Sequence, residues 1–352
     1  MKAATSRGPN AGVSALARDL GAIAADTSFS GVVRVDGPRG LEVVRAYGLA
    51  DRSHAIPNEA DTQFGIASGS KGFTALVVMR LVEDGALELS TTARSVLGAD
   101  LPLIDERVTV EHLLAHRSGI GDYLDEELDL DLSEYLMPVP TQQLATTEAY
   151  LDVLDGHAQK FAPGERFAYS NGGYVVLALI AERAAGTSFH DLVRDVVCTP
   201  AGMGDTAFLR SDELPGRAAV GYVQVDGAWR TNVFHLPVRG SGDGGAYTTA
   251  ADVAAFWRAL FAGAIVGEET LAEMLRKRSE ASADRGYGLG FWLPADGRGV
   301  LLVGSDSGVA FRSAHDPDRA ATWTLISNTR EGASAIAARL EEERTGSSGI
   351  PR

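Results

Sequence analysis

The sequence predicts an α+β protein in which one antiparallel sheet is assembled from both ends of the chain. Strand-like apolar runs occur near the N-terminus and again beyond about residue 205, whereas helical patterns dominate the stretch between them. A chain of 352 residues is long enough for one large domain or two closely packed subdomains. We therefore expect an α/β sandwich in which helices flank the sheet and a mostly helical subdomain is inserted.

The predicted organisation has two subdomains and two loose ends. The sheet-containing subdomain is discontinuous and comprises residues 12–66 and 205–345, and the helical subdomain comprises residues 67–204. Residues 1–11 and 346–352 are expected to be tails. A site would lie in the crevice between the two subdomains, where ligand pockets commonly form.

The first predicted elements are a helix and a hairpin. Residues 12–26 have the amphipathic pattern of a helix. Two valine-rich runs follow at residues 31–36 and 41–47, separated by the turn residues 37–40. This hairpin would supply the N-terminal part of the sheet.

The middle of the chain carries most of the predicted helices, and the last third carries most of the predicted strands. Helices are expected at residues 73–82, 108–116, 147–154, 173–185, 189–197, 249–260 and 333–343. Strands are expected at residues 219–225, 287–293, 300–304, 311–315 and 322–327. A glycine-rich loop covers residues 240–245.

The composition excludes several classes of function. A net charge of -15 argues against nucleic acid or an anionic membrane surface as a partner. No stretch approaches the ~20 apolar residues of a membrane span, and residues 1–19 lack the apolar core of a secretory signal. We therefore expect a cytoplasmic protein. The single cysteine, Cys198, excludes an internal disulfide and a cysteine zinc site.

The strongest candidates for chemistry are Ser68 and Lys71. Residues three apart share one helix face, so both side chains would lie at the start of an almost wholly apolar helix. Burial lowers the pKa of a lysine, and a neutral amine can accept the proton of a serine hydroxyl. The spacing predicts Ser68 as a nucleophile and Lys71 as its base. A Ser-x-x-Lys by itself is also compatible with a capped helix and a solvated lysine.

The second candidate motif is Tyr169 with Asn171, on a loop that precedes a predicted helix. Both side chains can point into one cleft. A tyrosine beside a cation can relay a proton, and an asparagine can orient a lysine or a substrate amide. Taken alone, the motif is equally compatible with an aromatic residue packed on the core.

Together these two motifs resemble the serine β-lactamase and penicillin-binding-protein superfamily, and more closely its class C β-lactamase-like branch. That branch contains D-alanyl-D-alanine carboxypeptidases, family VIII carboxylesterases, D-aminopeptidases and acyltransferases. Further segments resemble it in the expected order: residues 30–33, 47–51, 64–68, 112–119, 163–171, 200–206, 244–249 and 287–290. The resemblance implies the β-lactamase/transpeptidase-like fold, an acyl-enzyme on Ser68, Lys71 as base, Tyr169 as proton relay, Asn171 as a substrate-binding amide, and neither metal nor organic cofactor.

The third motif departs from the family pattern. Where the family usually has Lys-Thr-Gly or His-x-Gly, this chain has Ser305-Asp306-Ser307-Gly308. We expect Ser305 at the position of the cation and Gly308 as the second oxyanion-hole N–H, with a register that could differ by one or two residues. The missing cation argues against β-lactamase and DD-peptidase activity, and Asp306 could hold a substrate amine.

We expect a serine hydrolase that acts on a small-molecule carboxylic ester, because an ester needs less help with its leaving group than an amide. The same site would also suit a D-amino-acid amidase or peptidase, a β-lactamase or an acyltransferase. A rival of another class is a penicillin-recognising sensor module that is acylated without turnover. The acyl group, the leaving group and the oligomeric state are not predicted.

Three other features have plainer interpretations. His112 and His116 lie four apart on a helix face and are expected to be structural, since no third metal ligand accompanies them. Residues 122–134 hold seven carboxylates and are expected to form a solvated surface loop without calcium-loop spacing. Arg312 could replace the missing cation, but a surface position on its strand is expected instead.

Overall fold

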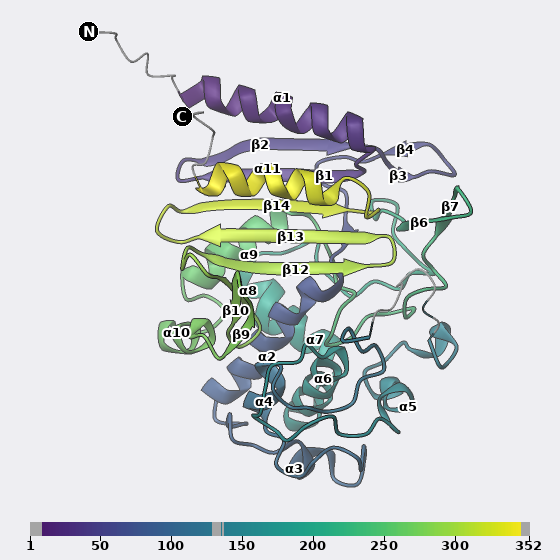
Figure 1. Ribbon diagram of the computed structural model, residues 1–352, viewed down its shortest axis with the longest axis vertical. Helices are drawn as coiled ribbons and strands as arrows, with labels where there is room; N and C mark the ends of the chain where they lie inside the picture. The colour runs from purple at the N-terminus through teal and green to yellow at the C-terminus, as the bar shows by residue number, and fades with distance from the viewer. Residues whose placement is uncertain (1–8, 129–134, 136, 346–352) are drawn as a thin grey trace.

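The fold is built on one antiparallel sheet, seen here in a computed structural model that describes residues 9–128, 135 and 137–345 (Figure 1). Within these residues the sheet has eight strands in the order β2-β1-β14-β13-β12-β11-β10-β9. The strands are β1 (Gly31–Gly37), β2 (Gly40–Tyr47), β9 (Ser279–Ser282), β10 (Arg285–Tyr287), β11 (Trp292–Pro294), β12 (Val300–Asp306), β13 (Val309–Asp316) and β14 (Ala321–Ser327).

The sheet joins the two ends of the chain, as the sequence predicts. Strand β1 pairs with β14, so that Gly31 lies opposite Ser327. Strands β12, β13 and β14 follow one another as antiparallel neighbours. The predicted α+β fold with a sheet from N- and C-terminal strands is therefore confirmed.

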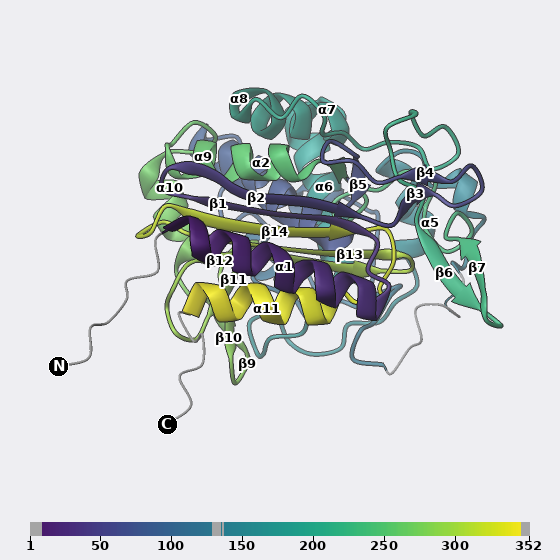
Figure 2. The same ribbon diagram turned by 90° about the horizontal axis from the view of Figure 1, so that it is seen from above.

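Helices cover both faces of the sheet (Figure 2). Helices α1 (Pro9–Thr27) and α11 (Ala333–Thr345) lie on one face, where apolar side chains such as Leu20 and Trp323 are buried. The other face carries α2 (Lys71–Glu83), α6 (Asn171–Ala185) and α9 (Ala250–Phe261). The remaining α-helices of the described residues are α3 (Ala93–Leu97), α4 (Val110–Leu114), α5 (Leu151–Leu154), α7 (Phe189–Val193), α8 (Thr199–Ala201) and α10 (Glu268–Leu275). Short 3₁₀ or π helices are η1 (Ala67–Ser70), η2 (Thr141–Gln143), η3 (Glu148–Tyr150) and η4 (Arg194–Cys198).

Helix α2 is buried on nearly all sides, which is what its apolar sequence predicts. Its residues from Lys71 to Met79 are all buried, and it belongs to a core cluster that also contains α6 and α9 residues. This core cluster contains residues from both sides of the predicted subdomain boundaries, at residues 66–67 and 204–205. The division of the chain into two subdomains at these boundaries therefore stays a prediction. Among the described residues, no helix is long and apolar enough to cross a membrane.

Several details differ from the sequence-based expectation. The single strand expected at residues 287–293 is two strands, β10 and β11, with residues 288–291 between them. Helix α1 begins at Pro9, so residues 9–11 do not belong to a loose tail. The strand expected at residues 219–225 is shorter, β6 (Tyr222–Val225), and pairs only with β7 (Ala228–Thr231) in a separate hairpin. Its first half is buried and its second half is exposed. Residues 1–8 and 346–352, expected to be tails, lie outside the described residues.

Two more two-stranded sheets lie beside the main one. One pairs β3 (Leu49–Asp51) with β4 (Ile56–Pro57). The other pairs β5 (Phe64–Gly65) with β8 (Tyr247–Thr248), and this pairing brings the glycine-rich loop of residues 240–245 to the start of α2.

Candidate active site

Ser68 lies in a short 3₁₀ turn, Ala67–Ser70, immediately before α2. Ala67 has a φ of 43°, in the left-handed region that a non-glycine residue adopts only at a cost. The turn is held by the Ser70 hydroxyl, which donates to the Ala67 carbonyl at 2.9 Å and accepts from the Ala246 N–H at 3.1 Å. Ser68 is thus fixed on a rigid, strained turn.

The side-chain nitrogen of Lys71, Nζ, is surrounded by three oxygen atoms. It lies 3.0 Å from Ser68 Oγ, 2.8 Å from Asn171 Oδ1 and 2.6 Å from the Asp243 carbonyl oxygen. The residue is only 2% exposed. A neutral amine has two N–H bonds, which suffice for the amide and carbonyl oxygens, and one lone pair, which would then face the serine hydroxyl.

The charge state of Lys71 is set by two opposing effects. Burial lowers its pKa, and the nearby carboxylates, Asp243 first among them, raise it. Burial wins, so the pKa lies below the usual value for a lysine. This shift makes the neutral amine more accessible than it is in water.

Tyr169 lies against the same pair. Lys71 Nζ lies 4.9 Å from the centre of its ring. Burial raises the Tyr169 pKa well above its usual value, Glu126 raises it further, and the interaction with the Ser68 side chain opposes them. The phenol is therefore protonated at neutral pH and suited to giving a proton rather than taking one.

Asn171 is the first residue of α6, whose N-cap is Ser170. The Ser170 hydroxyl accepts the Gly173 N–H at 3.0 Å, which fixes the start of the helix. The Asn171 amide then reaches in two directions: Oδ1 accepts from Lys71, and Nδ2 donates to Glu126 Oε1 at 3.1 Å. The structure thus brings Ser68, Lys71, Tyr169 and Asn171 together.

Strand β12 passes directly beside the Ser68 turn, and Gly304 is the residue that permits this approach. A Cβ at position 304 would lie 2.0 Å from the Ile66 carbonyl oxygen and 2.8 Å from the Gly69 nitrogen. Glycine has no Cβ, so the strand can pack against the turn. Side chains alternate along a strand, so Asp306 shares the face of Gly304, and Ser305 points to the opposite face.

The four residues expected to form the third motif do not gather at one place. Ser305 and Asp306 contribute to the pocket that contains Ser68. Gly308 lies instead in the turn between β12 and β13 with a φ of 69°, packed against Tyr222. Ser307 is buried, and its carbonyl accepts from Asn232 Nδ2 at 2.8 Å.

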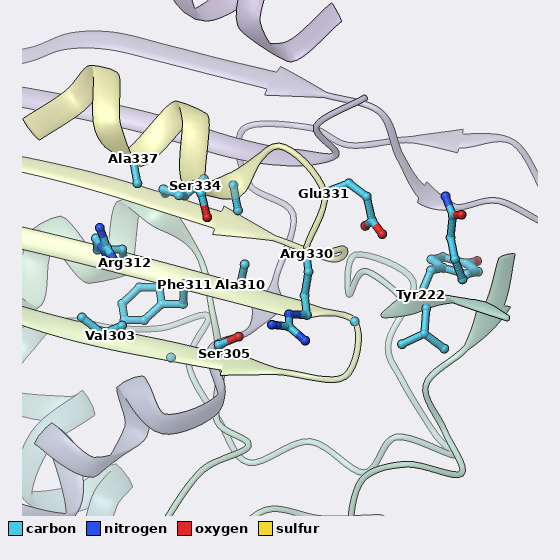
Figure 3. A pocket seen from close by; sticks show the side chains of 16 residues that line it. Tyr222, Val303, Ser305, Ala310, Phe311, Arg312, Arg330, Glu331, Ser334 and Ala337 are labelled. Atoms are coloured by element: carbon cyan, nitrogen blue, oxygen red, sulfur yellow. The ribbon is translucent and has the colours of Figure 1, made fainter. Parts of the chain in front are cut away.

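A separate groove lies on the α11 side of the sheet, and it receives the side chains of Ser305, Arg312 and Arg330 (Figure 3). Arg312 pairs with Val303, whose side chain packs in the apolar layer beneath α1 and α11. The Arg312 side chain therefore points away from Ser68 and supplies no cation to the Ser68 pocket. It is half-buried rather than on a fully exposed surface.

The glycine-rich loop was not expected to be part of the site. Its Asp243 carbonyl accepts from Lys71, and its Gly242 carbonyl accepts from the Thr74 hydroxyl at 2.6 Å. A Cβ at Gly242 would lie 2.0 Å from the Tyr174 carbonyl oxygen. The density of glycines in this loop was the available signal, because glycine marks a close backbone approach.

The acidic segment that begins at residue 122 contributes side chains to the site and is not only a solvated surface loop. Asp122 is 9% exposed and accepts the Gly172 N–H at 2.9 Å, and burial raises its pKa to about 6. Glu126 lines the Ser68 pocket. Residues 129–134 of this segment lie outside the described residues.

The Ser68 pocket has a volume of about 80 Å³, and three acidic residues are among those that line it. Glu126, Asp243 and Asp306 line it. Burial raises the Asp306 pKa to about 7, and the charge of Asp243 adds to this. Tyr123 donates a hydrogen bond from its hydroxyl to the Asp243 carboxylate.

The two histidines that are expected to be structural make different contacts. His112 completes a capping box with Thr109 at the start of α4. His116 is fully buried beside Tyr169. Among the residues that the structure describes, no group of three or more histidine, cysteine or acidic side chains could hold a metal ion.

Comparison with known proteins places this geometry in a family. The family model described as Beta-lactamase matches residues 5–345. Penicillin-binding protein 4* of Bacillus subtilis is 28% identical over 81% of this chain, which spans 65% of that relative, less than two thirds of its length. Esterase EstB of Burkholderia gladioli is 31% identical over 70% of this chain and 70% of its own length.

Solved structures give the same result. The penicillin-binding protein of Bacillus halodurans is 35% identical with a TM-score of 0.87, covering 92% of this chain and 99% of that one. The D-amino acid amidase of Ochrobactrum anthropi is 26% identical with a TM-score of 0.77, covering 97% of this chain and 99% of that one.

The fold is that of a penicillin-binding protein, as the match to a solved structure shows. The chain belongs to the beta-lactamase family.

Proposed function

We propose that the protein hydrolyses a small carboxylic ester through a covalent acyl-enzyme on Ser68. The observation that carries this proposal is the contact of Ser68 Oγ, which lines a pocket, with Lys71 Nζ at 3.0 Å, beside the Tyr169 ring. Ser68 Oγ attacks the carbonyl carbon, and the C–O bond to the leaving group breaks after a tetrahedral intermediate. Water then attacks the acyl carbon and releases the acid and free Ser68.

The protons move between Lys71 and Tyr169. Lys71 accepts the Ser68 proton, because burial favours its neutral form and its other two contacts need only two N–H bonds. Tyr169 is protonated and lies beside Lys71, so it delivers a proton to the leaving alkoxide and is reprotonated from Lys71.

We propose the backbone N–H groups of Ser68 and Ser305 as the oxyanion hole. Asp306 pairs with Val309 across a two-residue turn, so these two residues exchange the ladder hydrogen bonds and the Ser305 N–H points away from β13. Strand β11 pairs with β12 only at Leu301, which leaves this edge open beside the Ser68 turn. Ser305 therefore replaces Gly308 as our second donor.

The test is a substrate panel on the wild type and Ser68→Ala. It comprises a p-nitrophenyl ester, nitrocefin and a D-amino-acid p-nitroanilide, with an added alcohol to detect acyl transfer. Steady ester turnover that disappears in Ser68→Ala supports the proposal. Ester turnover that survives in Ser68→Ala contradicts the nucleophile, and a stoichiometric burst without turnover favours the sensor module.

A second candidate is hydrolysis of an amide or ester whose acyl group carries an amine. The observation that favours it is the polarity of the pocket: Glu126, Asp243 and Asp306 line it, and none of the three has an ion-pair partner among the described residues. A substrate ammonium group would pair with the ionised carboxylates, and it would favour the ionised form of Asp306, whose pKa burial raises to about 7. The likeness to a D-amino acid amidase supports the same class.

A matched pair of esters separates the two candidates. Phenylalanine p-nitrophenyl ester and 3-phenylpropionate p-nitrophenyl ester differ only in the amine. The amine candidate expects a lower KM for the first ester in the wild type and an equal KM for both in Asp306→Asn. Equal KM values in the wild type would reject the amine candidate and leave ester hydrolysis standing.

A further inference from the structure

We propose that His116 is a positioning residue that holds the Tyr169 phenol at Ser68. The inference rests on the proposed role of Tyr169 as proton donor. The imidazole of His116 lies 4.3 Å from the centre of the Tyr169 ring, and the residue is 0% exposed. It touches neither Ser68 nor Lys71 through any hydrogen bond recorded among the described residues, so it would act through Tyr169.

The segment that carries Tyr169 is tied to His116 on both sides of the tyrosine. The carbonyl of His116 accepts the Ala168 N–H at 2.9 Å, and its Nδ1 accepts the Ser170 N–H at 3.1 Å. With the ring contact to Tyr169 included, His116 therefore holds three consecutive residues, 168–170, through its side chain and its backbone.

Two features suit His116 to this task. Its backbone has a φ of 54°, a left-handed conformation in which histidine is more common than most side chains. Its Nδ1 acts as an acceptor, so the ring is the neutral tautomer with the proton on Nε2, and burial lowers its pKa well below the usual value, as does the charge of Lys71. A neutral ring adds no cation beside Lys71.

Trp292 supports the same tyrosine from the sheet. Its ring stacks on Tyr169 with centroids 5.9 Å apart and an angle of 16° between the planes. Both aromatic neighbours restrict the rotation of the Tyr169 side chain, and a proton donor displaced by about 1 Å loses much of its rate advantage.

The test uses His116→Asn, which keeps an acceptor for the Ser170 N–H and tolerates the left-handed backbone but removes the ring. We expect kcat to fall about ten-fold on an ester with a poor leaving group, such as a phenyl ester, and far less on the p-nitrophenyl ester of the same acid, with KM nearly unchanged. A positioning residue predicts this selectivity because a good leaving group needs no proton.

The decisive measurement is the double variant. In a Tyr169→Phe background, His116→Asn should cause no further loss on the phenyl ester, because its effect passes through the missing phenol. Losses that multiply, or equal losses on both esters, would overturn the inference. The matched control is His315→Phe, a buried histidine that stacks on Trp257 5.7 Å away and should leave the ratio of the two esters unchanged.

Two outcomes keep the inference apart from the proposed function. If Tyr169→Phe alone has normal activity on both esters, the role of Tyr169 as proton donor fails, and the inference fails with it. If Tyr169→Phe is impaired but His116→Asn is normal on both esters, only the inference is overturned. Should His116→Asn not fold, Trp292→Leu, at a half-buried position, gives the same selective loss if the phenol must be held.

Discussion

At the scale of the residue, the site is governed by burial. Lys71 lies where its charge is disfavoured, and Tyr169 lies where its proton is retained. In the proposed mechanism the two shifts are complementary, because a base must start without its proton and an acid must start with it. Both depend on the protein excluding water around Ser68 rather than on any ion pair with Lys71.

The pH dependence of kcat/KM follows from these directions. Activity should rise with pH as Lys71 loses its proton, with an apparent pKa below the usual value near 10.5. The value of kcat/KM should not fall again until far above pH 10, because the Tyr169 pKa is raised well above its usual value.

Lys71→Met should lower kcat/KM by at least ~10² and abolish the rise of kcat/KM with pH. Steady-state kinetics between pH 6 and 10 check this, and a variant with near-normal kinetics would refute Lys71 as base.

Asp306 should make the protein less stable at high pH. Its folded-state pKa of about 7 lies above the usual 3.8, so the folded protein holds this proton more tightly than the unfolded chain. The stabilisation from Asp306 is complete below pH 3.8 and is lost as the pH rises to about 7. Asp306→Asn should therefore raise the melting temperature at pH 8 and leave it unchanged at pH 3.5, as measured by circular dichroism. A melting temperature that rises equally at both pH values would contradict the assignment.

At the scale of the element, the site depends on how closely three segments approach. The Ser68 turn lies between strand β12 and the glycine-rich loop, and glycines without room for a Cβ occur on both sides, at Gly304 and Gly242. Such contacts allow backbone groups, rather than side chains, to face the nucleophile.

Gly304→Ala tests this arrangement. The new Cβ would meet the Ile66 carbonyl oxygen at 2.0 Å, so β12 or the turn must shift. We expect the unfolding free energy to fall by about 1–3 kcal/mol. We also expect kcat to fall in the protein that remains folded, because the Ser305 N–H would move away from the position of the oxyanion. Gly216→Ala is the control, since a Cβ there meets nothing within 4 Å. Denaturant unfolding and ester kinetics decide, and unchanged kcat in Gly304→Ala would argue against β12 as the second donor.

At the scale of the whole molecule, the sheet separates a supporting layer from the reacting layer. Helices α1 and α11 pack on one face, and the Ser68 turn and α2 lie on the other (Figure 2). Mutations in the supporting layer should change stability without changing chemistry.

Leu20→Ala makes this separation measurable. Leu20 belongs to α1, is 0% exposed and packs in the apolar layer between this helix and the sheet, and truncation of a buried leucine costs about 2–5 kcal/mol. We expect a lower melting temperature with KM and kcat unchanged below the transition. An altered KM in a variant that is still folded would show that the two layers are coupled.

The sequence determined the parts of this protein that depend on local spacing. A serine and a lysine three apart must share one face of a helical turn, and an apolar run after them must be buried, so Ser68, Lys71 and α2 were predictable from neighbours along the chain. The pairing of Tyr169 with Asn171, at the entry to α6, was predictable in the same way.

Only the tertiary structure decided which distant backbone atoms meet this pair. The Asp243 carbonyl that binds Lys71 lies 172 residues away, and no periodicity near either residue encodes that contact. The face to which each β12 residue points is likewise a tertiary property. The sequence indicated that residues Ser305 to Gly308 form the third motif, but which of their side chains face Ser68 depends on the pleat of the strand and on where a Cβ would collide with the Ser68 turn. Packing therefore turned Asp306 toward Ser68 and Arg312 away, and it set the polarity of the pocket that substrates must enter.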